Sequence, residues 1–116
     1  GVDGEPKDVT LIGYSLGASR ALSLARKYPD VYTKLVLIAA PSMPAPAGLD
    51  RVRAALMMAG SRDRQDAMKA GARAFERAGI PSTYQVLPGA AHGEMGSSPE
   101  RAMRDALSWL EDNARD

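Results

Sequence analysis

The sequence predicts an α/β fold: a three-layer α/β/α arrangement around a mainly parallel sheet of about four strands. Short apolar runs alternate along the chain with longer amphipathic stretches, a pattern typical of repeated strand–helix units in a parallel sheet. The 116 residues are enough for one domain with a core of its own. We therefore expect residues 1–116 to form a single domain.

The first half of the chain contains two predicted strands with a helix between them. Residues 9–12 and 35–39 are short runs with little polar interruption, as expected of strands that helices cover on both faces. Residues 16–28 repeat apolar side chains at helical spacing, and Pro29 cannot continue the helix.

The second half repeats this pattern after a Pro- and Ala-rich connection at residues 41–48, which is too short to be a domain. Residues 56–59 predict a third covered strand. Residues 64–78 predict a helix with one apolar face, which ends before Gly79. Residues 83–87 mix polar and apolar side chains, which favours a strand at the edge of the sheet.

A third helix is predicted near the end of the chain. Ser98 is a candidate N-cap, Pro99 suits the first helical position, and Glu100 suits the opening turn. Leu107 and Leu110 belong to the apolar stripe that follows.

Composition narrows the classes of function. Lys and Arg (15) nearly balance Asp and Glu (14), so the charge gives no indication of nucleic-acid binding. The absence of cysteine excludes disulfides, thiolate nucleophiles and thiolate metal sites. No apolar run approaches the roughly twenty residues of a membrane span, and no signal-peptide pattern opens the chain. We expect a soluble protein, with the cytoplasm favoured, although a chain that begins with Gly1 carries no information on an upstream targeting signal.

A G-x-S-x-G motif is the strongest chemical signal. Gly13, Tyr14, Ser15, Leu16 and Gly17 fall where a predicted strand ends and a predicted helix begins. Such a turn strains the serine backbone and exposes the hydroxyl, while the flanking glycines leave room for strand and helix to approach. The Leu16 amide would then point at the developing oxyanion. The serine would also suit a helix cap, but the order of strand, motif and helix favours a nucleophile.

A serine nucleophile needs a general base and an acid that orients the base. His92 is the only histidine and lies in a glycine-containing loop after the fourth predicted strand. Asp63 follows the third predicted strand, although an Asp before a helix is also a common N-cap. Asp66 is a second candidate, expected inside the helix, whereas Asp50 precedes its strand and should project from the opposite end of the sheet.

The three candidates share one predicted location. Ser15, Asp63 and His92 each follow the C-terminal end of a predicted strand, where open α/β sheets bind ligands. Their chain order is that of the α/β-hydrolases. Residues 9–17 (VTLIGYSLG), 59–63 (AGSRD) and 88–93 (PGAAHG) resemble the three catalytic segments of that superfamily. The resemblance spans nearly the whole chain and implies that Ser15, Asp63 and His92 are nucleophile, acid and base.

The resemblance also implies a partial α/β-hydrolase fold. The four strands would be the last four of the family's eight, without the loop that supplies another oxyanion-hole amide. Family topology places a further strand beside the one leading to Ser15, so we expect an exposed apolar edge that a missing N-terminal segment or a second chain would complete. The connection at residues 41–48 is too short for the lid domain that many members of the superfamily insert there. In this it resembles the lidless carboxylesterases, thioesterases and dienelactone hydrolases.

These features predict a serine hydrolase that cleaves a carboxylic ester or thioester through an acyl-enzyme on Ser15. No cofactor or metal is required, and the expected partner is a small acyl substrate. An acyltransferase with the same three residues is one alternative. A non-catalytic interaction module derived from a hydrolase fold is the other.

Overall fold

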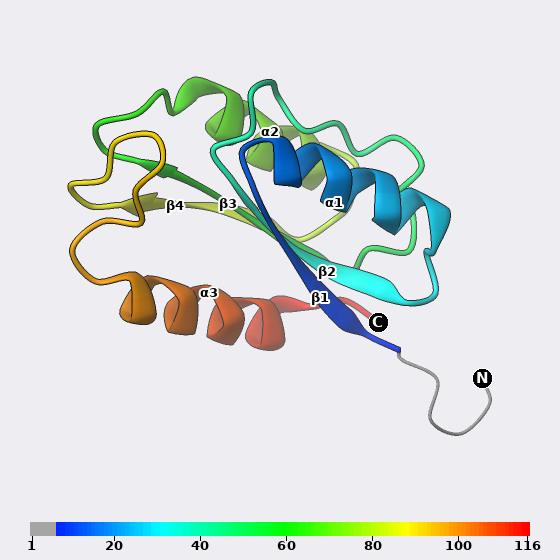
Figure 1. Ribbon diagram of the computed structural model, residues 1–116. Helices are drawn as coiled ribbons and strands as arrows, with labels where there is room; N and C mark the ends of the chain where they lie inside the picture. Colours follow the sequence, from blue (N-terminus) through cyan, green and yellow to red (C-terminus); the bar gives the residue numbers. More distant parts are fainter. Residues whose placement is uncertain (1–6) are drawn as a thin grey trace.

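The computed structural model describes residues 7–116 as one sheet between two helical layers (Figure 1). The elements in chain order are β1 (Val9–Tyr14), α1 (Leu16–Lys27), β2 (Tyr32–Ile38), β3 (Ala54–Gly60), α2 (Asp66–Arg77), β4 (Ser82–Leu87) and α3 (Pro99–Asn113). The strand order is β1-β2-β3-β4, and every neighbouring pair is parallel. The predicted three-layer α/β fold is confirmed, as is the edge position of the fourth strand.

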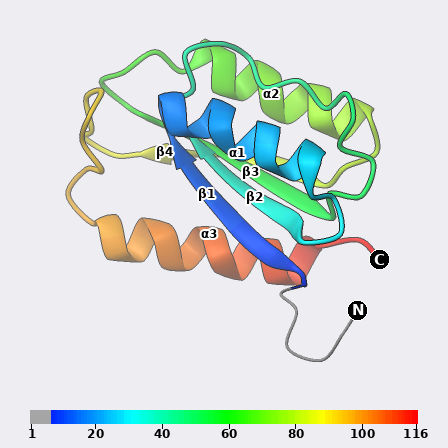
Figure 2. The same cartoon turned by 45° about the vertical axis from the view of Figure 1, so that its right-hand side comes forward.

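Helices α1 and α2 cover one face of the sheet, and α3 covers the other (Figures 1 and 2). Because side chains alternate along a strand, Leu35 and Leu37 of β2 pack toward α1 and α2, whereas Val36 and Ile38 pack toward α3. Phe75 of α2 is fully buried in the first of these layers. The central strands β2 and β3 are therefore buried on both faces.

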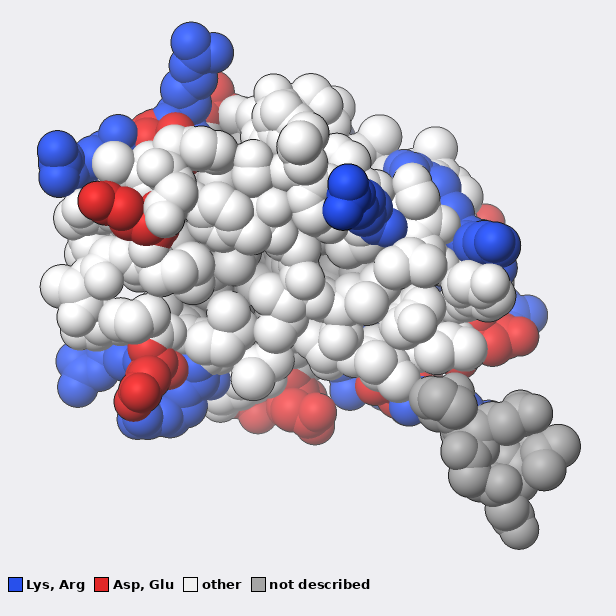
Figure 3. Space-filling view, viewed as in Figure 1, with Lys and Arg blue, Asp and Glu red and all other residues white. Residues whose placement is uncertain are grey.

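Strand β1 is less well covered than its sequence predicts. Leu11 packs beneath α1, but α3 packs against β3 and β4 and Ile12, on the α3 side of β1, is 50% exposed. Figure 3 shows a broad surface without charged side chains over this part of the molecule. The prediction that the first strand is covered on both faces is wrong, because α3 lies under the other half of the sheet.

Strand β2 begins at Tyr32, earlier than the apolar run that predicted it. Thr33 and Lys34 are polar yet buried. The Thr33 hydroxyl donates to Asp8 at 2.7 Å, and Lys34 pairs with Glu111 of α3 at 3.4 Å. These partners satisfy polar groups that would otherwise be costly to bury, so hydrophobicity alone does not locate the start of the strand.

The helix ends differ slightly from the predicted ones. Helix α2 begins at Asp66 with Gln65 as its N-cap residue, two residues after the predicted start. Ser98 does occupy the N-cap position of α3 and Pro99 its first position, but the Ser98 side chain makes no capping hydrogen bond. No helix within residues 7–116 is long and apolar enough to cross a membrane.

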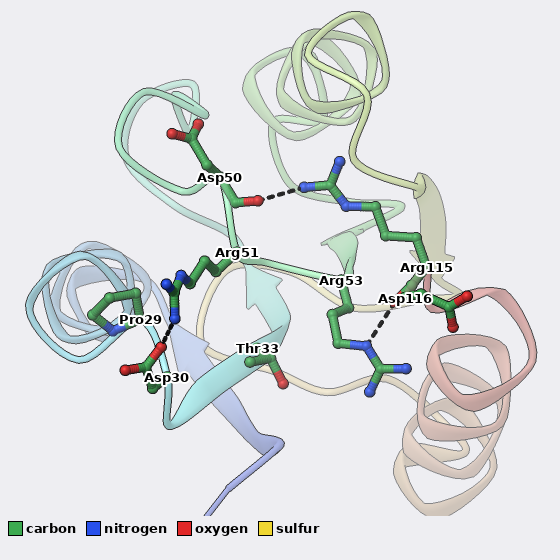
Figure 4. A pocket seen from close by; sticks show the side chains of 8 residues that line it. All are labelled: Pro29, Asp30, Thr33, Asp50, Arg51, Arg53, Arg115 and Asp116. Atoms are coloured by element: carbon green, nitrogen blue, oxygen red, sulfur yellow. Dashed lines mark hydrogen bonds and ion pairs between the residues drawn. The ribbon is translucent and has the colours of Figure 1, made fainter.

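The amino ends of the strands, opposite Ser15, are tied to the residues that follow α3. Figure 4 shows the residues that line a pocket at this end, among them Asp50, which lies at the end of the sheet opposite Ser15 as predicted. The Arg115 guanidinium donates to the carbonyl oxygens of Asp50, Val52 and Gly79 at 2.8 to 3.1 Å. Arg53 in turn donates to the Arg115 carbonyl at 2.6 Å. Both guanidinium groups donate to backbone carbonyls, so we assign this cluster a structural role and not a binding role.

Candidate active site

Strand β1 ends in a strained turn at Ser15. This residue has φ 55° and ψ −116°, a backbone region that non-glycine residues seldom adopt. Its amide donates to the Ile38 carbonyl of β2 at 2.7 Å. The Ser15 side chain makes no capping hydrogen bond to α1, which argues against a simple helix cap.

The two glycines of the motif have different surroundings. A Cβ on Gly13 would lie 2.4 Å from the Gly17 carbonyl oxygen and 2.7 Å from the Ala18 Cα, so strand and helix approach each other too closely for a side chain there. A Cβ on Gly17 would meet nothing within 4 Å among the described residues. The prediction that glycine is needed for the close approach of strand and helix therefore holds for Gly13 and is wrong for Gly17.

The structure brings Ser15, His92 and Asp63 into one chain of contacts. Ser15 Oγ lies 3.2 Å from His92 Nε2, and His92 Nδ1 lies 2.8 Å from Asp63 Oδ2. In a neutral imidazole, a proton on Nδ1 would be donated to the carboxylate, which leaves Nε2 free to accept the serine proton. This arrangement can activate the hydroxyl.

Asp63 is held as a charged acceptor. Its carboxylate is 14% exposed and also accepts the Arg64 amide at 2.8 Å. Partial burial alone would raise the pKa of Asp63. The hydrogen bonds from His92 and the Arg64 amide, together with the nearby imidazole and the Arg64 charge, lower it by a larger amount, so the net pKa lies below the ordinary 3.8. Gln65, and not Asp63, is the N-cap residue of α2.

The Leu16 amide is the predicted oxyanion donor. Leu16 is the first residue of α1, so its N–H has no carbonyl partner within the helix and lies at the positive end of the helix dipole. Leu16 as a whole residue is 67% exposed. The position suits the stabilisation of negative charge beside Ser15.

An open pocket of about 530 Å³ lies in front of Ser15. Its lining comprises Ser15, Ala39, Ala40, Pro41, Asp63, Arg64, Asp66, Ala67 and His92. Small side chains form one part of the wall, and the start of α2 contributes charged ones. Asp66 lines this pocket as the first residue of α2, whereas the imidazole hydrogen bond goes to Asp63.

The loop that carries Asp63 is joined to the loop that carries His92. The Ser61 amide donates to the Leu87 carbonyl at 3.0 Å, and the Ser61 hydroxyl accepts the Gly89 amide at 2.7 Å. A Cβ on Gly60 would lie 2.1 Å from the Ala90 carbonyl oxygen, so the two loops touch through backbone atoms. Sequence reasoning missed Ser61, because contacts between distant loops leave no local pattern.

Two further side chains hold the His92 loop. The Glu94 carboxylate accepts the Ala91 amide at 2.9 Å. The Tyr14 hydroxyl accepts the Gly93 amide at 2.5 Å across a separation of 79 residues. Glu94 lies only three positions from Ala91, a local spacing that could have indicated the contact. Tyr14 occupies a variable position of the motif, and nothing in the sequence singles it out.

Comparison with known proteins identifies the fold. No family model and no curated protein sequence matches this chain. A bacterial esterase structure matches 94% of the chain with a TM-score of 0.76 and 18% identity, and the chain covers 39% of that protein. A thermophilic esterase from Thermogutta terrifontis matches 94% with a TM-score of 0.69 and 19% identity, with 66% of that protein covered.

A third similar structure is an α/β-hydrolase enzyme from the metagenome of lagoon sediments at Mar Chica, Morocco. It matches 91% of the chain with a TM-score of 0.61 and 16% identity, and the chain covers 62% of it. This chain thus spans between 39% and 66% of the length of these three proteins. These likenesses, together with the parallel sheet, show an α/β-hydrolase fold.

Proposed function

We propose that this chain, with its α/β-hydrolase fold, acts as a serine hydrolase on a carboxylic ester or thioester. One observation carries the proposal: Ser15 Oγ, the His92 imidazole and the Asp63 carboxylate lie in series at 3.2 Å and 2.8 Å. A serine hydroxyl is a poor nucleophile until a base removes its proton. The series supplies both that base and the carboxylate that orients it.

The first half-reaction would acylate Ser15. His92 Nε2 accepts the hydroxyl proton while Oγ attacks the carbonyl carbon of the substrate. The negative charge moves to the carbonyl oxygen, where the Leu16 amide donates to it. Asp63 stabilises the imidazolium that forms. His92 then gives its proton to the departing alcohol or thiol, and the acyl group remains on Ser15.

The second half-reaction would release the acid. His92 removes a proton from water, and the resulting hydroxide attacks the acyl carbon. When the tetrahedral intermediate collapses, Ser15 Oγ leaves and recovers the proton from His92, so the enzyme returns to its starting state. An alcohol or thiol in place of water would make the same residues an acyltransferase.

The pocket supports a small acyl substrate. Ala39, Ala40, Pro41 and Ala67 line it with short apolar side chains, which suit the acyl part of an ester. The pocket is open, so the leaving group can extend into solvent. We therefore propose short-chain esters and thioesters as the substrate class.

A fluorophosphonate probe tests the proposal, because it labels only activated serines. The protein should be labelled once, Ser15→Ala should abolish labelling, and His92→Ala should slow it by about a thousandfold or more. Ser23→Ala is the matched control: this exposed α1 serine donates only to the Ser19 carbonyl and should leave the rate unchanged. A folded wild-type protein that resists labelling would exclude the hydrolase and favour a non-catalytic interaction module.

A further inference from the structure

The Tyr14 side chain links the strand that carries the nucleophile to the loop that carries the base. Its hydroxyl accepts the Gly93 amide at 2.5 Å. Its ring centroid lies 5.8 Å from the His92 ring centroid, with the two planes tilted by 44°. One side chain next to Ser15 therefore contacts both the imidazole and the backbone just beyond it.

The loop between β4 and α3 needs such support. Gly89, Gly93 and Gly96 have φ values of 75°, 92° and 83°, and residues 88–98 contain no helix or strand. Glycine gives this loop many accessible conformations. The His92 side chain is 54% exposed, so core packing does not fix the imidazole.

Other hydrogen bonds of the loop come from the neighbouring loop that carries Asp63 and from within the loop itself. The Gly89 amide is held by Ser61 of the neighbouring loop, and the Ala91 amide is held by Glu94 within the loop itself. Asp63 of that neighbouring loop also holds the His92 imidazole. Among the described residues, the hydrogen bonds that reach the loop from β1 and the turn after it are those from Tyr14 and Ser15.

We infer that Tyr14 is a positioning residue that keeps the His92 imidazole within reach of Ser15. The inference rests on the proposed function, because it assumes that His92 is the general base. The hydroxyl fixes the Gly93 backbone, and the ring limits the swing of the imidazole. Tyr14 also packs at the margin of the apolar layer beneath α3, and Tyr14→Phe keeps this packing while it removes the hydroxyl.

The first test compares the rates at which a fluorophosphonate labels Ser15. Tyr14→Phe should lower the second-order rate constant about five- to tenfold, as expected for one lost hydrogen bond. The final stoichiometry should stay at one label per chain, because the fold is kept. Tyr28→Phe, which removes an exposed tyrosine hydroxyl at the far end of α1, should have no effect. Equal rates for Tyr14→Phe and wild type would overturn the inference.

A double variant separates positioning from a direct effect on the serine. If Tyr14 acts through the imidazole, Tyr14→Phe should have no further effect in a His92→Ala background. A further five- to tenfold loss in that background would show that Tyr14 acts on Ser15 directly and would reject the positioning role.

Amide exchange and proton NMR test the contact without any activity. The Gly93 amide should exchange with solvent about tenfold faster in Tyr14→Phe than in Tyr28→Phe. The ring signals of His92, which are unambiguous because the chain has one histidine, should shift in the first variant only. If Ser15 of the wild type resists labelling, the proposed function fails, whereas these signals still decide whether Tyr14 holds His92. Unchanged Gly93 exchange would refute the inference in either case.

Discussion

Asp63 shows how one carboxylate can set the tautomer of the His92 imidazole, the proposed general base. The Asp63–His92 hydrogen bond of 2.8 Å favours the imidazole with its proton on Nδ1. Asp63→Asn keeps the shape of the side chain but offers an amide that favours the wrong tautomer. We expect kcat for a 4-nitrophenyl ester to fall by about a thousandfold or more, with little change in KM. Asp66 lines the same pocket, and Asp66→Asn should alter kcat only a few fold. A comparable loss in both variants would contradict a special role for Asp63.

The lowered pKa of Asp63 has a consequence for the pH profile. Because this pKa lies below 3.8, the carboxylate stays ionised at neutral and mildly acidic pH. The rate profile should therefore show no ionisation of Asp63 at neutral or mildly acidic pH. Because the pKa of Asp63 is lower in the folded protein than in the unfolded chain, ionised Asp63 stabilises the fold above pH 3.8. This stabilisation is lost as the pH falls through the lowered pKa of the folded state. A titration of the Asp63 carboxyl group above pH 3.8, followed by NMR, would be inconsistent with this assignment.

At the scale of single residues, the sequence predicted those that are rare in the chain or belong to a recognisable motif. His92 is the only histidine and Ser15 sits in a motif, so few candidates compete with them, and the structure brings both together with Asp63. Tyr14 and Ser61 act through hydrogen bonds to backbone amides of a distant loop. Such contacts depend on loop geometry, which the residue types do not encode.

The elements β1 and α1 meet at the turn that exposes Ser15, and this turn depends on one glycine. Gly13→Ala should force the start of α1 away from the strand, because its Cβ would lie 2.4 Å from the Gly17 carbonyl oxygen. We expect a lower melting temperature and a loss of fluorophosphonate labelling of at least tenfold. Gly17→Ala is the matched control, since its Cβ has open space. Equal behaviour of the two variants would show that backbone approach does not shape the turn.

The existence of each strand and helix was predictable, and several boundaries were not. Apolar runs and helical spacing identified all seven elements. The start of β2 was missed because Thr33 and Lys34 are polar but paired. The start of α2 was placed too early because Arg64 and Gln65 fit a helix by residue type, although both precede the helix and the Arg64 amide donates to Asp63.

At the scale of the whole molecule, the sequence predicted the three layers but not how evenly the helices cover the two faces of the sheet. Periodicity indicates which face of a helix is apolar, whereas the part of the sheet beneath that helix depends on the connecting loops. Strand β1 consequently keeps Ile12 half exposed, and within residues 7–116 it pairs on one side only, with β2. We propose that a further strand, from another part of the protein or another chain, pairs with this edge.

The exposed edge should make the 116-residue chain self-associate. Sedimentation at rising concentration should show species larger than the monomer. Ile12→Lys should reduce this association with little effect on the melting temperature, because a charge on an edge strand opposes pairing. Leu24→Lys places the same charge on α1, where Leu24 is 37% exposed, and should leave association unchanged. A wild-type chain that stays monomeric and melts cooperatively would contradict the proposal.

Within residues 7–116, α3 is the only helix on the second face of the sheet, and it carries a fluorescent side chain that can report on that face. Trp109 of α3 is the only tryptophan in the chain and packs at the margin of the apolar layer under the sheet. Because α3 follows the loop that carries His92, detachment of α3 from the sheet would make that loop more mobile, while the turn at Ser15 would stay intact. Tryptophan emission would then shift at the temperature at which hydrolysis is lost, below the temperature at which the sheet melts.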